Sequence, residues 1–541
     1  MTSDTTSTLR AVADAARAGD LERAADLAEA ALGDNAEHPL LLNLRAWRKE
    51  AGGDFEGALT DLTRAREIAP ADVPTLNALG LCLANLDRPS EAIEAFDAAI
   101  AAKADFFPAH FNRGWTLEAL GELDLARQSH ETAAGLNPAA GPPLACLASL
   151  AGRRGDWAGA RDLAGRSLAL DPRQPTAVLA LAGADLGQND PEAAKARLID
   201  LLSWQGLTPA DLALAHGLMG DVLERLDRPR QAFAHFAAAN AALLQRYKSR
   251  FAGGGGETTP QWLAWVTDYF LNAAKPAWGP PQSIGESRSA SHVFLLGFPR
   301  SGTTLLEQVL ARAENVVTLE EKDTLAPLVR EFMTGPVGLD RLAAIEGEAL
   351  DRRRQAYWDR IADLGVDAAG KIVIDKLPLN TMKLPIIAKL FPDAKVIFAV
   401  RDPRDVVLSC FRQRFAMNAS MFEFLSLDGT ARFYDGVMGL AEIYRAKLAL
   451  DLKLHRYETL IEDFEGATKA VCAFIGAKWN PDMEQFASRL DGRVVATPSS
   501  TQVARGLYTA GVGQWRRYAH DLAPILPILA PWVSKFGYAP D

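Results

Sequence analysis

Residues 293–304 read VFLLGFPRSGTT, and the amphipathic pattern LLEQVLARA follows them. Four consecutive apolar residues, Val293 to Leu296, favour a short strand buried in a parallel sheet. A strand, a glycine-containing loop and a helix in this order form a phosphate cradle, because backbone N–H groups and the helix N-terminus point at the anion. The stretch therefore predicts an α/β domain that holds an anion at the end of this strand.

The loop keeps the two glycines of a Walker A motif but lacks its lysine. Gly297 and Gly302 stand at the GxxxxG spacing, and Thr303 occupies the lysine position. A nucleotide hydrolase needs that point charge at the β and γ phosphates, so the change argues against cleavage of ATP or GTP. Arg300 supplies a cation from inside the loop instead, and Thr303 and Thr304 supply donors at the first turn of the helix.

A second strand-like run ends in another basic turn. AKVIFAV, residues 394–400, is followed by RDPRD, residues 401–405, and then by the helical VVLSCFRQRF. We expect Arg401, Arg404 and Ser409 at the carboxyl edge of the sheet, where open α/β sheets bind ligands. Two anion sites on one edge indicate a ligand with phosphates at both ends. A solvated charged turn is the alternative for RDPRD.

The N-terminal half repeats with a step of 34 residues. Three columns share this step: an alanine, a turn residue five positions earlier, and a small residue seven positions before that. The alanines are Ala24, Ala58, Ala92, Ala126, Ala160 and Ala194, the turn residues are Gly19, Gly53, Asp87, Gly121, Gly155 and Asn189, and the small residues are Gly80, Gly114, Ala148 and Ala182. Such columns are typical of two antiparallel helices that pack through small residues and reverse at a tight turn.

This pattern resembles the tetratricopeptide repeat. Gly220, Asp227 and Ala232 continue it after a four-residue insertion near Ser203 to Pro209, which gives about seven repeats. An all-α solenoid is therefore predicted for residues 3–250, and an alanine-rich bundle without repeat order is the alternative.

The remaining chain divides at a glycine-rich break. FAGGGG begins at Phe251, a helical stretch follows around Gln261 to Ala273, and a Pro/Gly/Ser-rich run comes next. Residues 251–290 are predicted to be a linker with a short helix, and residues 291–541 to be the α/β domain.

The two basic loops together resemble sulfotransferases that use 3′-phosphoadenosine 5′-phosphosulfate (PAPS). PRSGTT resembles their 5′-phosphosulfate loop, and VRDPRDVVLS resembles their 3′-phosphate motif, in which an arginine and a serine eight residues later hold the phosphate. The resemblance is to the tyrosylprotein sulfotransferase branch, and to bacterial proteins that join tetratricopeptide repeats to such a domain. It implies a P-loop-like domain with a central parallel sheet, PAPS as donor and 3′-phosphoadenosine 5′-phosphate (PAP) as product. The donor-binding residues that it implies in these loops are Pro299, Arg300, Ser301, Gly302, Thr303, Thr304, Arg401 and Ser409.

The same resemblance implies the catalytic residues. Glu321, in TLEEKD, lies 21 residues after Arg300, at the spacing of the branch's catalytic glutamate, and is expected to be the general base. Glu320 is the alternative base, and a solvated helix start is the alternative interpretation of the acidic pair. Lys376, in IVIDKLPLN, resembles the catalytic lysine. Together with Arg300 it would stabilise negative charge in the transition state.

Three further positions resemble the nucleotide site of the branch. Tyr457 follows a predicted strand, with a strand-end core aromatic as the alternative, and Ser500 in SSTQV is a candidate 3′-phosphate ligand. Gln514 departs from the branch, which has lysine before the tryptophan that matches Trp515. A cation is therefore missing there unless Arg505, Arg516 or Arg517 replaces it.

Composition limits the remaining possibilities. The 58 basic and 68 acidic residues give a net charge of −10, which argues against general binding of nucleic acid or anionic membranes. The four cysteines form no CxxC pair, no His/Asp/Glu set has metal-ligand spacing, and no metal is expected. MTSDTTSTLR lacks the pattern of a signal peptide, and residues 522–533 are too short and proline-rich to span a bilayer. A cytoplasmic protein without a membrane span is therefore expected.

The sequence thus favours a PAPS-dependent sulfotransferase that acts in line on an acceptor hydroxyl. A tyrosine of a peptide or protein is the favoured acceptor, because the resembled branch modifies peptide tyrosines and a solenoid suits peptide binding. A carbohydrate, a lipid or a small phenol is an alternative acceptor. A P-loop kinase-like enzyme and a non-catalytic repeat scaffold are alternative functions. The oligomeric state is left open, a homodimer included.

Overall fold

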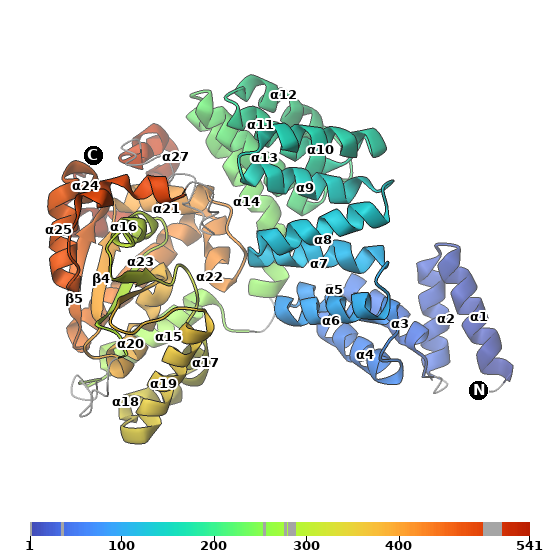
Figure 1. Cartoon of the computed structure of the whole chain (residues 1–541), viewed down its shortest axis with the longest axis horizontal. Coiled ribbons are helices and arrows are strands. Elements are labelled where there is room, and N and C mark those ends of the chain that lie inside the picture. Colours follow the sequence, from blue (N-terminus) through green and yellow to red (C-terminus); the bar gives the residue numbers. More distant parts are fainter. Residues whose placement is uncertain are drawn as a thin grey trace. The chain divides into compact units, whose positions relative to one another are not determined.

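The computed structural model describes residues 3–33, 37–252, 256–274, 278–279, 288–490 and 511–540. It divides the chain into two compact units, Met1–Trp204 and Gln205–Asp541. The first is helical, and the second contains a sheet (Figure 1). The predicted fold class, a helical repeat region followed by an α/β domain with a parallel sheet, is confirmed.

The first unit is a series of helix hairpins, seen in blue to teal in Figure 1. Its helices are α1 (Ser3–Arg17), α2 (Leu21–Gly33), α3 (Pro39–Ala51), α4 (Phe55–Ile68), α5 (Val73–Asn85), α6 (Pro89–Ala102), α7 (Phe107–Leu120), α8 (Leu123–Leu136), α9 (Gly141–Arg153), α10 (Trp157–Leu170), α11 (Pro175–Gly187) and α12 (Pro191–Leu202).

The repeat columns have clear structural roles. Every residue of the turn column has a positive φ, from 55° at Asp227 to 83° at Gly53, including the non-glycine residues Asp87 and Asn189. Glycine, asparagine and aspartate tolerate this left-handed conformation best, so the column marks the hairpin turns. The alanine column, from Ala24 to Ala232, is fully buried.

Small residues in the first helix of a hairpin make room for rings in the second. A Cβ built on Gly80 would lie 2.5 Å from the Phe96 ring, and one on Gly220 would lie 2.3 Å from the Phe236 ring. The glycines therefore allow the two helices to approach closely, as the small-residue column predicts.

The seventh helix pair keeps the repeat but belongs to the second unit. Helices α13 (Pro209–Arg225) and α14 (Pro229–Phe251) form this hairpin. Asn240 donates from Nδ2 to the Phe411 carbonyl at 2.8 Å, and Arg412 forms an ion pair with Glu224. The sequence repeat extends to about residue 250, whereas the boundary between the two compact units lies between Trp204 and Gln205.

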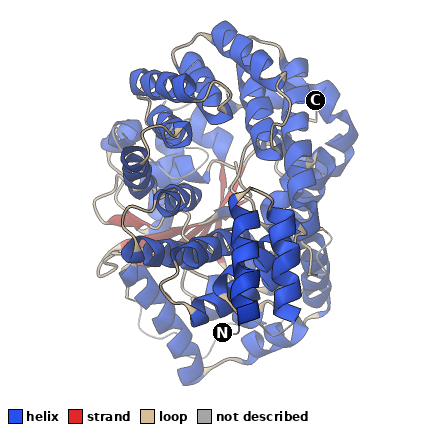
Figure 2. Cartoon of the chain, turned by 90° about the vertical axis from the view of Figure 1, so that its right-hand side faces the viewer, coloured by secondary structure: helices blue, strands red, loops and turns tan. Residues whose placement is uncertain are grey.

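The sheet of the second unit is wholly parallel, with the strand order β2-β3-β1-β4-β5. Figure 2 shows the strands in red. They are β1 (Ser291–Gly297), β2 (Val316–Thr318), β3 (Ile372–Lys376), β4 (Lys395–Val400) and β5 (Asp451–Arg456). The central strand β1 pairs with β3 on one side and β4 on the other, so chain order reverses there, and such a switch point is where ligands bind.

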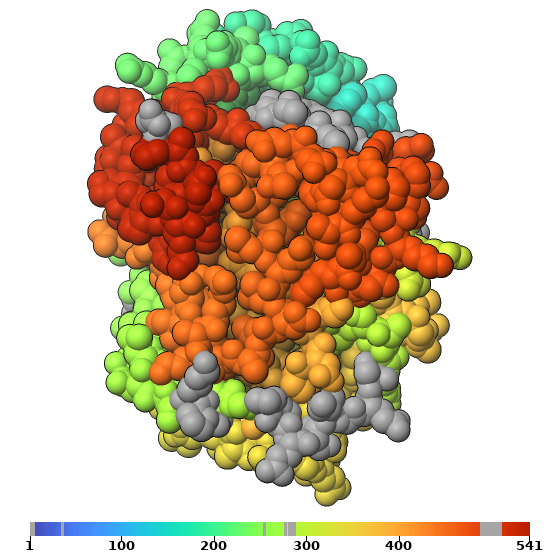
Figure 3. Space-filling model, turned by 90° about the vertical axis from the view of Figure 1, so that its left-hand side faces the viewer, coloured from blue at the N-terminus to red at the C-terminus, as the bar shows by residue number. Residues whose placement is uncertain are grey.

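Both faces of the sheet are buried in apolar cores. Phe294 and Leu296 of β1 belong to the larger core, and Val293 and Leu295 to the other. The helices of this unit after β1 are α16 (Thr303–Leu310), α17 (Ala326–Phe332), α18 (Pro336–Ala344), α19 (Gly347–Asp363), α20 (Leu384–Leu390), α21 (Pro403–Arg412), α22 (Ala419–Phe422), α23 (Leu427–Lys447), α24 (Tyr457–Glu462), α25 (Phe464–Ile475), α27 (Ala519–Leu522) and α28 (Leu526–Lys535). In Figure 3 orange segments occupy the middle of the face, and the red C-terminal segment lies to their left.

Short 3₁₀ helices complete the unit: η2 (Pro378–Lys383), η3 (Glu423–Leu425), η4 (Pro481–Leu490), η6 (Gln514–Tyr518) and η7 (Ala523–Ile525).

The helix predicted within residues 251–290 is α15 (Thr259–Asn272). Leu263, Val266 and Phe270 on one of its faces belong to the larger core of the second unit. Trp262 donates from Nε1 to the Met333 carbonyl at 3.0 Å. The helix is therefore held by the α/β domain.

In the described ranges, no helix combines the length and apolar character needed to cross a bilayer. Each of the four cysteines is a buried free thiol.

The glycine column can be tested by adding one methyl group. We expect Gly80→Ala to destabilise the chain by about 1–3 kcal/mol, because the new Cβ overlaps the Phe96 ring. Gly165→Ala is the matched control, since Gly165 lies in α10 with nothing near its Cβ position, and should stabilise by up to about 1 kcal/mol. The midpoint of urea unfolding measures both. Equal stabilisation by the two changes would contradict the close packing.

Candidate active site at the carboxyl edge of the sheet

The pairing of β1 with β4 places the two predicted anion loops side by side. Gly297 is level with Ala399 at the ends of the two strands. Gly297 has φ 152°, and a Cβ there would lie 2.5 Å from the Ala399 carbonyl oxygen. Thr381 fixes the same residue, since its Oγ1 donates to the Gly297 carbonyl at 2.8 Å. The first loop thus leaves the sheet directly beside the second.

The first loop turns into α16 beneath an aromatic ring. Gly302, the N-cap of α16, has φ 89°, and a Cβ there would lie 2.4 Å from Cδ2 of Tyr457. Thr303 and Thr304 form the first turn and are buried. Within the described residues, no side chain caps this helix, so its N–H groups face the loop as they do in phosphate cradles.

Arg300, Arg401 and Ser409 are brought together, in place of the predicted group of Arg401, Arg404 and Ser409. Arg300 donates from Nε to Ser409 Oγ at 2.9 Å, and Arg401 donates from Nη1 to the Arg300 carbonyl at 3.1 Å. Arg300 has φ 71°, which is strained for a non-glycine residue. Burial lowers the pKa of Arg300 to about 10, and it therefore stays a cation at neutral pH. Two buried guanidinium groups side by side form an electropositive site.

Arg404 does not join this group. Its guanidinium pairs with Asp402 at 2.7 Å, stacks on the Trp515 ring and donates to the Pro540 carbonyl at 2.9 Å. It therefore anchors the C-terminal segment against α21.

Two buried polar atoms are left for a ligand. In the part of the chain that the structure describes, Ser301 Oγ and Arg401 Nε have no hydrogen-bond partner. Buried polar groups are normally satisfied, so these atoms suit the oxygens of a bound anion. The residues present thus fit a ligand with phosphate or sulfate groups.

Tyr457 lies between the two loops. It opens α24, its ring covers Gly302, and the Arg401 guanidinium lies 5.0 Å from the ring centroid. Burial raises the pKa of its phenol. The ring also belongs to the smaller core, so it packs like a core aromatic and faces the loops as well.

Lys376 is fully buried between two carboxylates. Its Nζ lies 2.8 Å from Glu321 Oε1 and 3.2 Å from Glu307 Oε2. The contact is with Glu321 rather than with Glu320, which has φ 52° and turns the chain after β2. Sequence reasoning missed Glu307, although a glutamate inside the apolar run LLEQVL was a usable signal. Burial raises the pKa of Glu307 to about 7.

A buried hydrogen-bonded chain holds the Glu321 loop to β3. Thr324 Oγ1 and the Tyr357 hydroxyl donate to Asp375 Oδ2 at 2.5 and 2.8 Å. His292 Nε2 lies 2.9 Å from the same Tyr357 hydroxyl. Asp375 precedes Lys376 in β3, so one strand end positions both the lysine and the loop that carries its partner.

A cavity of about 650 Å³ opens in front of the first loop. Arg300, Thr304 and Glu321 line its polar end. The apolar side chains that line it are Trp262, Val329, Met333, Leu377, Leu379, Met382, Phe415 and Met421, and further polar ones are Glu257, Thr258, Thr259, Asp323, Lys383, Asn418 and Ser420. Helix α15 thus contributes to a wall that sequence reasoning did not assign to the site.

The C-terminal predictions have different outcomes. Ser500 and Arg505 lie outside the described residues. Arg517 pairs with Asp227, and Arg516 stacks on Trp515. The cation bonded to Gln514 comes from another element: Arg412, at the end of α21, donates from Nη1 to Gln514 Oε1 at 3.3 Å.

The site lies within a region that matches a known family. Residues 292–481 match the model of the sulfotransferase family, and residues 73–106 match the tetratricopeptide repeat. This confirms the resemblance predicted from the motifs. The first match covers the loops, Glu321, Lys376 and Tyr457.

Relatives point the same way. Protein-tyrosine sulfotransferase 1 of Danio rerio is 26% identical over 262 residues, which cover 46% of this chain and 72% of that protein. An uncharacterized protein of Aquifex aeolicus is 28% identical over 255 residues, 45% of this chain and only 33% of that protein. Among solved structures, a tetratricopeptide repeat protein of Parabacteroides merdae is 17% identical, covers 44% of this chain and 93% of its own, and has a TM-score of 0.37. The family match and the named relatives support a sulfotransferase.

The buried chain around Asp375 gives a pH-dependent stability. Burial raises the pKa of Asp375 from 3.8 to about 6, so the folded state holds a proton that the unfolded state has lost between these values, and stability falls as pH rises through that window. Asp375→Asn, which keeps an acceptor but cannot ionise, should gain about 3 kcal/mol relative to the original chain between pH 4 and pH 6.5. Urea unfolding at several pH values measures the difference. Asp363→Asn, at an exposed position, is the control. If the difference in unfolding free energy from the original chain does not depend on pH for either variant, the raised pKa of Asp375 is contradicted.

Proposed function

We propose that this protein transfers a sulfuryl group from PAPS to an acceptor hydroxyl. The observation that carries the proposal is that Arg300, bonded to Ser409 and Arg401, and Glu321, paired with Lys376, line one cavity. The family match and the named relatives favour the same chemistry.

The donor would be held at both of its phosphate ends. Gly302, Thr303 and Thr304 would offer N–H and hydroxyl donors to the 5′-phosphosulfate. Arg401 and Ser409 would hold the 3′-phosphate, with Tyr457 beside them. Pro299, Ser301 and Ser500 complete the donor residues that we propose. Anion binding is favoured because it would satisfy Ser301 Oγ and relieve the repulsion between neighbouring arginines.

The chemical step would rest on three side chains. Glu321 would accept the proton of the acceptor hydroxyl as the oxygen–sulfur bond forms. Arg300 and Lys376 would stabilise the negative charge that moves to the departing phosphate as the sulfur–oxygen bond to the donor breaks. The proton goes to the Glu321 carboxylate, the sulfuryl group to the acceptor, and PAP leaves. These roles use the chain's own residues throughout.

A phenol is the acceptor that the cavity suits best. Trp262, Phe415 and the neighbouring aliphatic side chains form an apolar wall, which a tyrosine ring can contact while its hydroxyl lies at Glu321. We therefore propose a tyrosine of a peptide or protein, and we propose that the repeat helices help to bind it.

Paired substitutions separate chemistry from donor binding. In Glu321→Gln the side-chain amide can keep an oxygen near Lys376, but an amide is a poor base. We therefore expect kcat to fall about 100–10,000-fold with little change in the KM for PAPS. Arg401→Ala should weaken PAP binding about 10–100-fold. The exposed Arg432→Ala removes a cation from α23 and should change neither value.

The measurements are transfer of ³⁵S from PAPS to a tyrosine peptide, with its phenylalanine twin as a blank, and titration of PAP by calorimetry. Transfer to a saccharide but not to the peptide would contradict the acceptor. Absence of PAP binding by the original chain, or magnesium-dependent ATP turnover, would contradict the donor and favour a kinase-like enzyme.

Glu307 is expected to set the upper limb of the pH profile. Burial raises the pKa of Glu307 to about 7, and above that pH its carboxylate draws on the Lys376 charge that the transition state needs. In the original chain kcat should therefore fall about tenfold as pH rises through this value. Glu307→Gln should remove that fall, and the exposed Glu314→Gln should keep it. The dependence of kcat on pH from 5.5 to 9 measures the effect, and identical profiles for all three chains would contradict it.

A further inference from the structure

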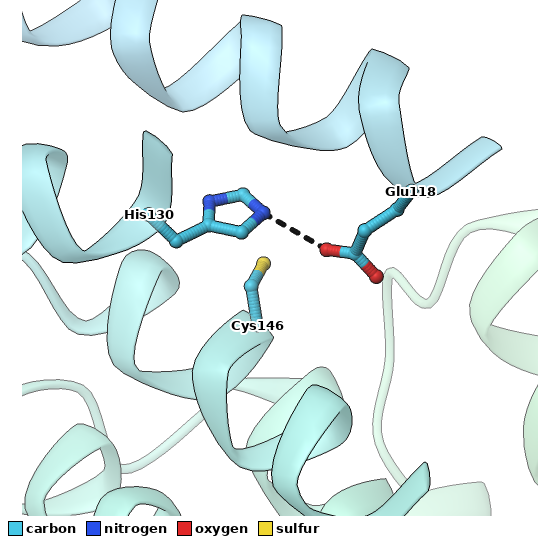
Figure 4. Close-up of side chains that lie close together, drawn as sticks. All are labelled: Glu118, His130 and Cys146. Carbon is cyan, nitrogen blue, oxygen red and sulfur yellow. Dashed lines mark hydrogen bonds and ion pairs between the residues drawn. The ribbon is translucent and has the colours of Figure 1, made fainter. Parts of the chain in front are cut away.

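Three potential metal ligands meet inside the repeat solenoid, far along the sequence from the candidate active site. They are Glu118 on α7, His130 on α8 and Cys146 on α9, and Figure 4 shows their side chains turned toward one another. One ligand atom from each lies within 4.8 Å of the others, and His130 Nε2 is 2.8 Å from Glu118 Oε1. The spacings of 12 and 16 residues match no sequence motif, because the hairpin fold creates the cluster.

His130 stands in a column that is otherwise apolar. At the equivalent position of the other six repeats the chain has a buried alanine, leucine or phenylalanine: Ala28, Leu62, Phe96, Ala164, Leu198 and Phe236. His130 is fully buried, and within the described residues its Nδ1 has no hydrogen-bond partner. Burying an imidazole costs free energy that an apolar side chain would not. Packing alone therefore does not explain a histidine here.

The environment of the ring is the one that phenylalanine has elsewhere. A Cβ built on Gly114 would lie 2.5 Å from the His130 ring, just as one on Gly80 would meet the Phe96 ring. The fold thus accepts phenylalanine at this position of the repeat. Only the repeat with His130 has a histidine there, and it lies beside the buried Cys146 and the Glu118 carboxylate.

We propose that Glu118, His130 and Cys146 bind one divalent transition-metal ion of the Zn²⁺ class. Imidazole nitrogen, thiolate sulfur and carboxylate oxygen are the ligands that zinc takes. Glutamate and thiolate together neutralise the dication, so a buried complex carries no net charge. Ligand atoms around tetrahedral zinc are about 3.3–3.8 Å apart, which the cluster reaches by small side-chain rotations.

Proton balance follows from the contacts. The ion displaces the thiol proton of Cys146, which goes to solvent. It also takes the place of the proton between His130 Nε2 and Glu118, and that proton moves to Nδ1. No oxidation or reduction takes place. The bound ion would tie three consecutive helices of the solenoid together, and water would complete its coordination.

The test uses the full chain stripped of metal with a chelator under reducing conditions. Zn²⁺ is titrated by calorimetry, and Co²⁺ is added as a spectroscopic probe, because a cobalt–thiolate bond gives a near-ultraviolet charge-transfer band. We expect one ion per chain, the cobalt band, and an increase in Tm with Zn²⁺.

Two variants and one control make the result specific. His130→Phe places in this repeat the residue that Phe96 and Phe236 supply in others, so it should fold, lose the cobalt band and bind Zn²⁺ at least about 100-fold more weakly. Cys146→Ala should also lose the band. Cys82→Ala removes a buried cysteine of another repeat and should keep it. Failure of the original chain to bind Zn²⁺, or equal binding and equal bands in all four chains, would overturn the proposal.

Discussion

The parallel pairing of β1 with β4 is the contact on which the candidate site depends. Strands that are adjacent and parallel end at the same edge, so this pairing brings Arg300 beside Arg401 although 100 residues separate them along the chain. Like charges repel, and Ser409 and backbone carbonyl oxygens accept hydrogen bonds from the two guanidinium groups. A bound anion would stabilise two neighbouring arginines. Glycine at position 297 is required because the Ala399 carbonyl leaves no room for a Cβ.

Local signals in the sequence predicted much of this architecture. Strand β1, the phosphate loop and α16 follow from one apolar run, two glycines and a helical period, all within about twenty residues. The hairpins follow from columns whose physical causes are a left-handed turn and a close helix contact. The partner of a buried charge was not predictable in this way. Glu307 meets Lys376 only because α16 packs on β3, and the Arg412 bond to Gln514 joins segments 102 residues apart.

The repeat pattern continues to about residue 250, whereas the first compact unit ends at Trp204. This difference has a physical cause. A solenoid repeat buries its apolar face against its neighbours, so the last repeat must be capped or covered. Helix α14 is covered by the α/β domain: Phe233 stacks on Phe411 with ring centroids 5.3 Å apart, and Asn240 satisfies the Phe411 carbonyl. Glu224 of α13 adds an ion pair with Arg412 and accepts from the Tyr518 hydroxyl at 2.5 Å. The last repeat thus cannot be removed without exposing the helix that carries Ser409.

The net charge of −10 and an anion site are compatible because burial changes the strength of each charge. Exposed acids are screened by salt within about 10 Å, whereas interactions among buried groups are screened much less. Arg300 and Lys376 are both buried, and of the two Arg300 lines the cavity. Burial also has a cost, which Lys376 offsets with two carboxylates and Arg300 with Ser409. The carboxylates that stabilise Lys376 in the fold also reduce the net positive charge around it.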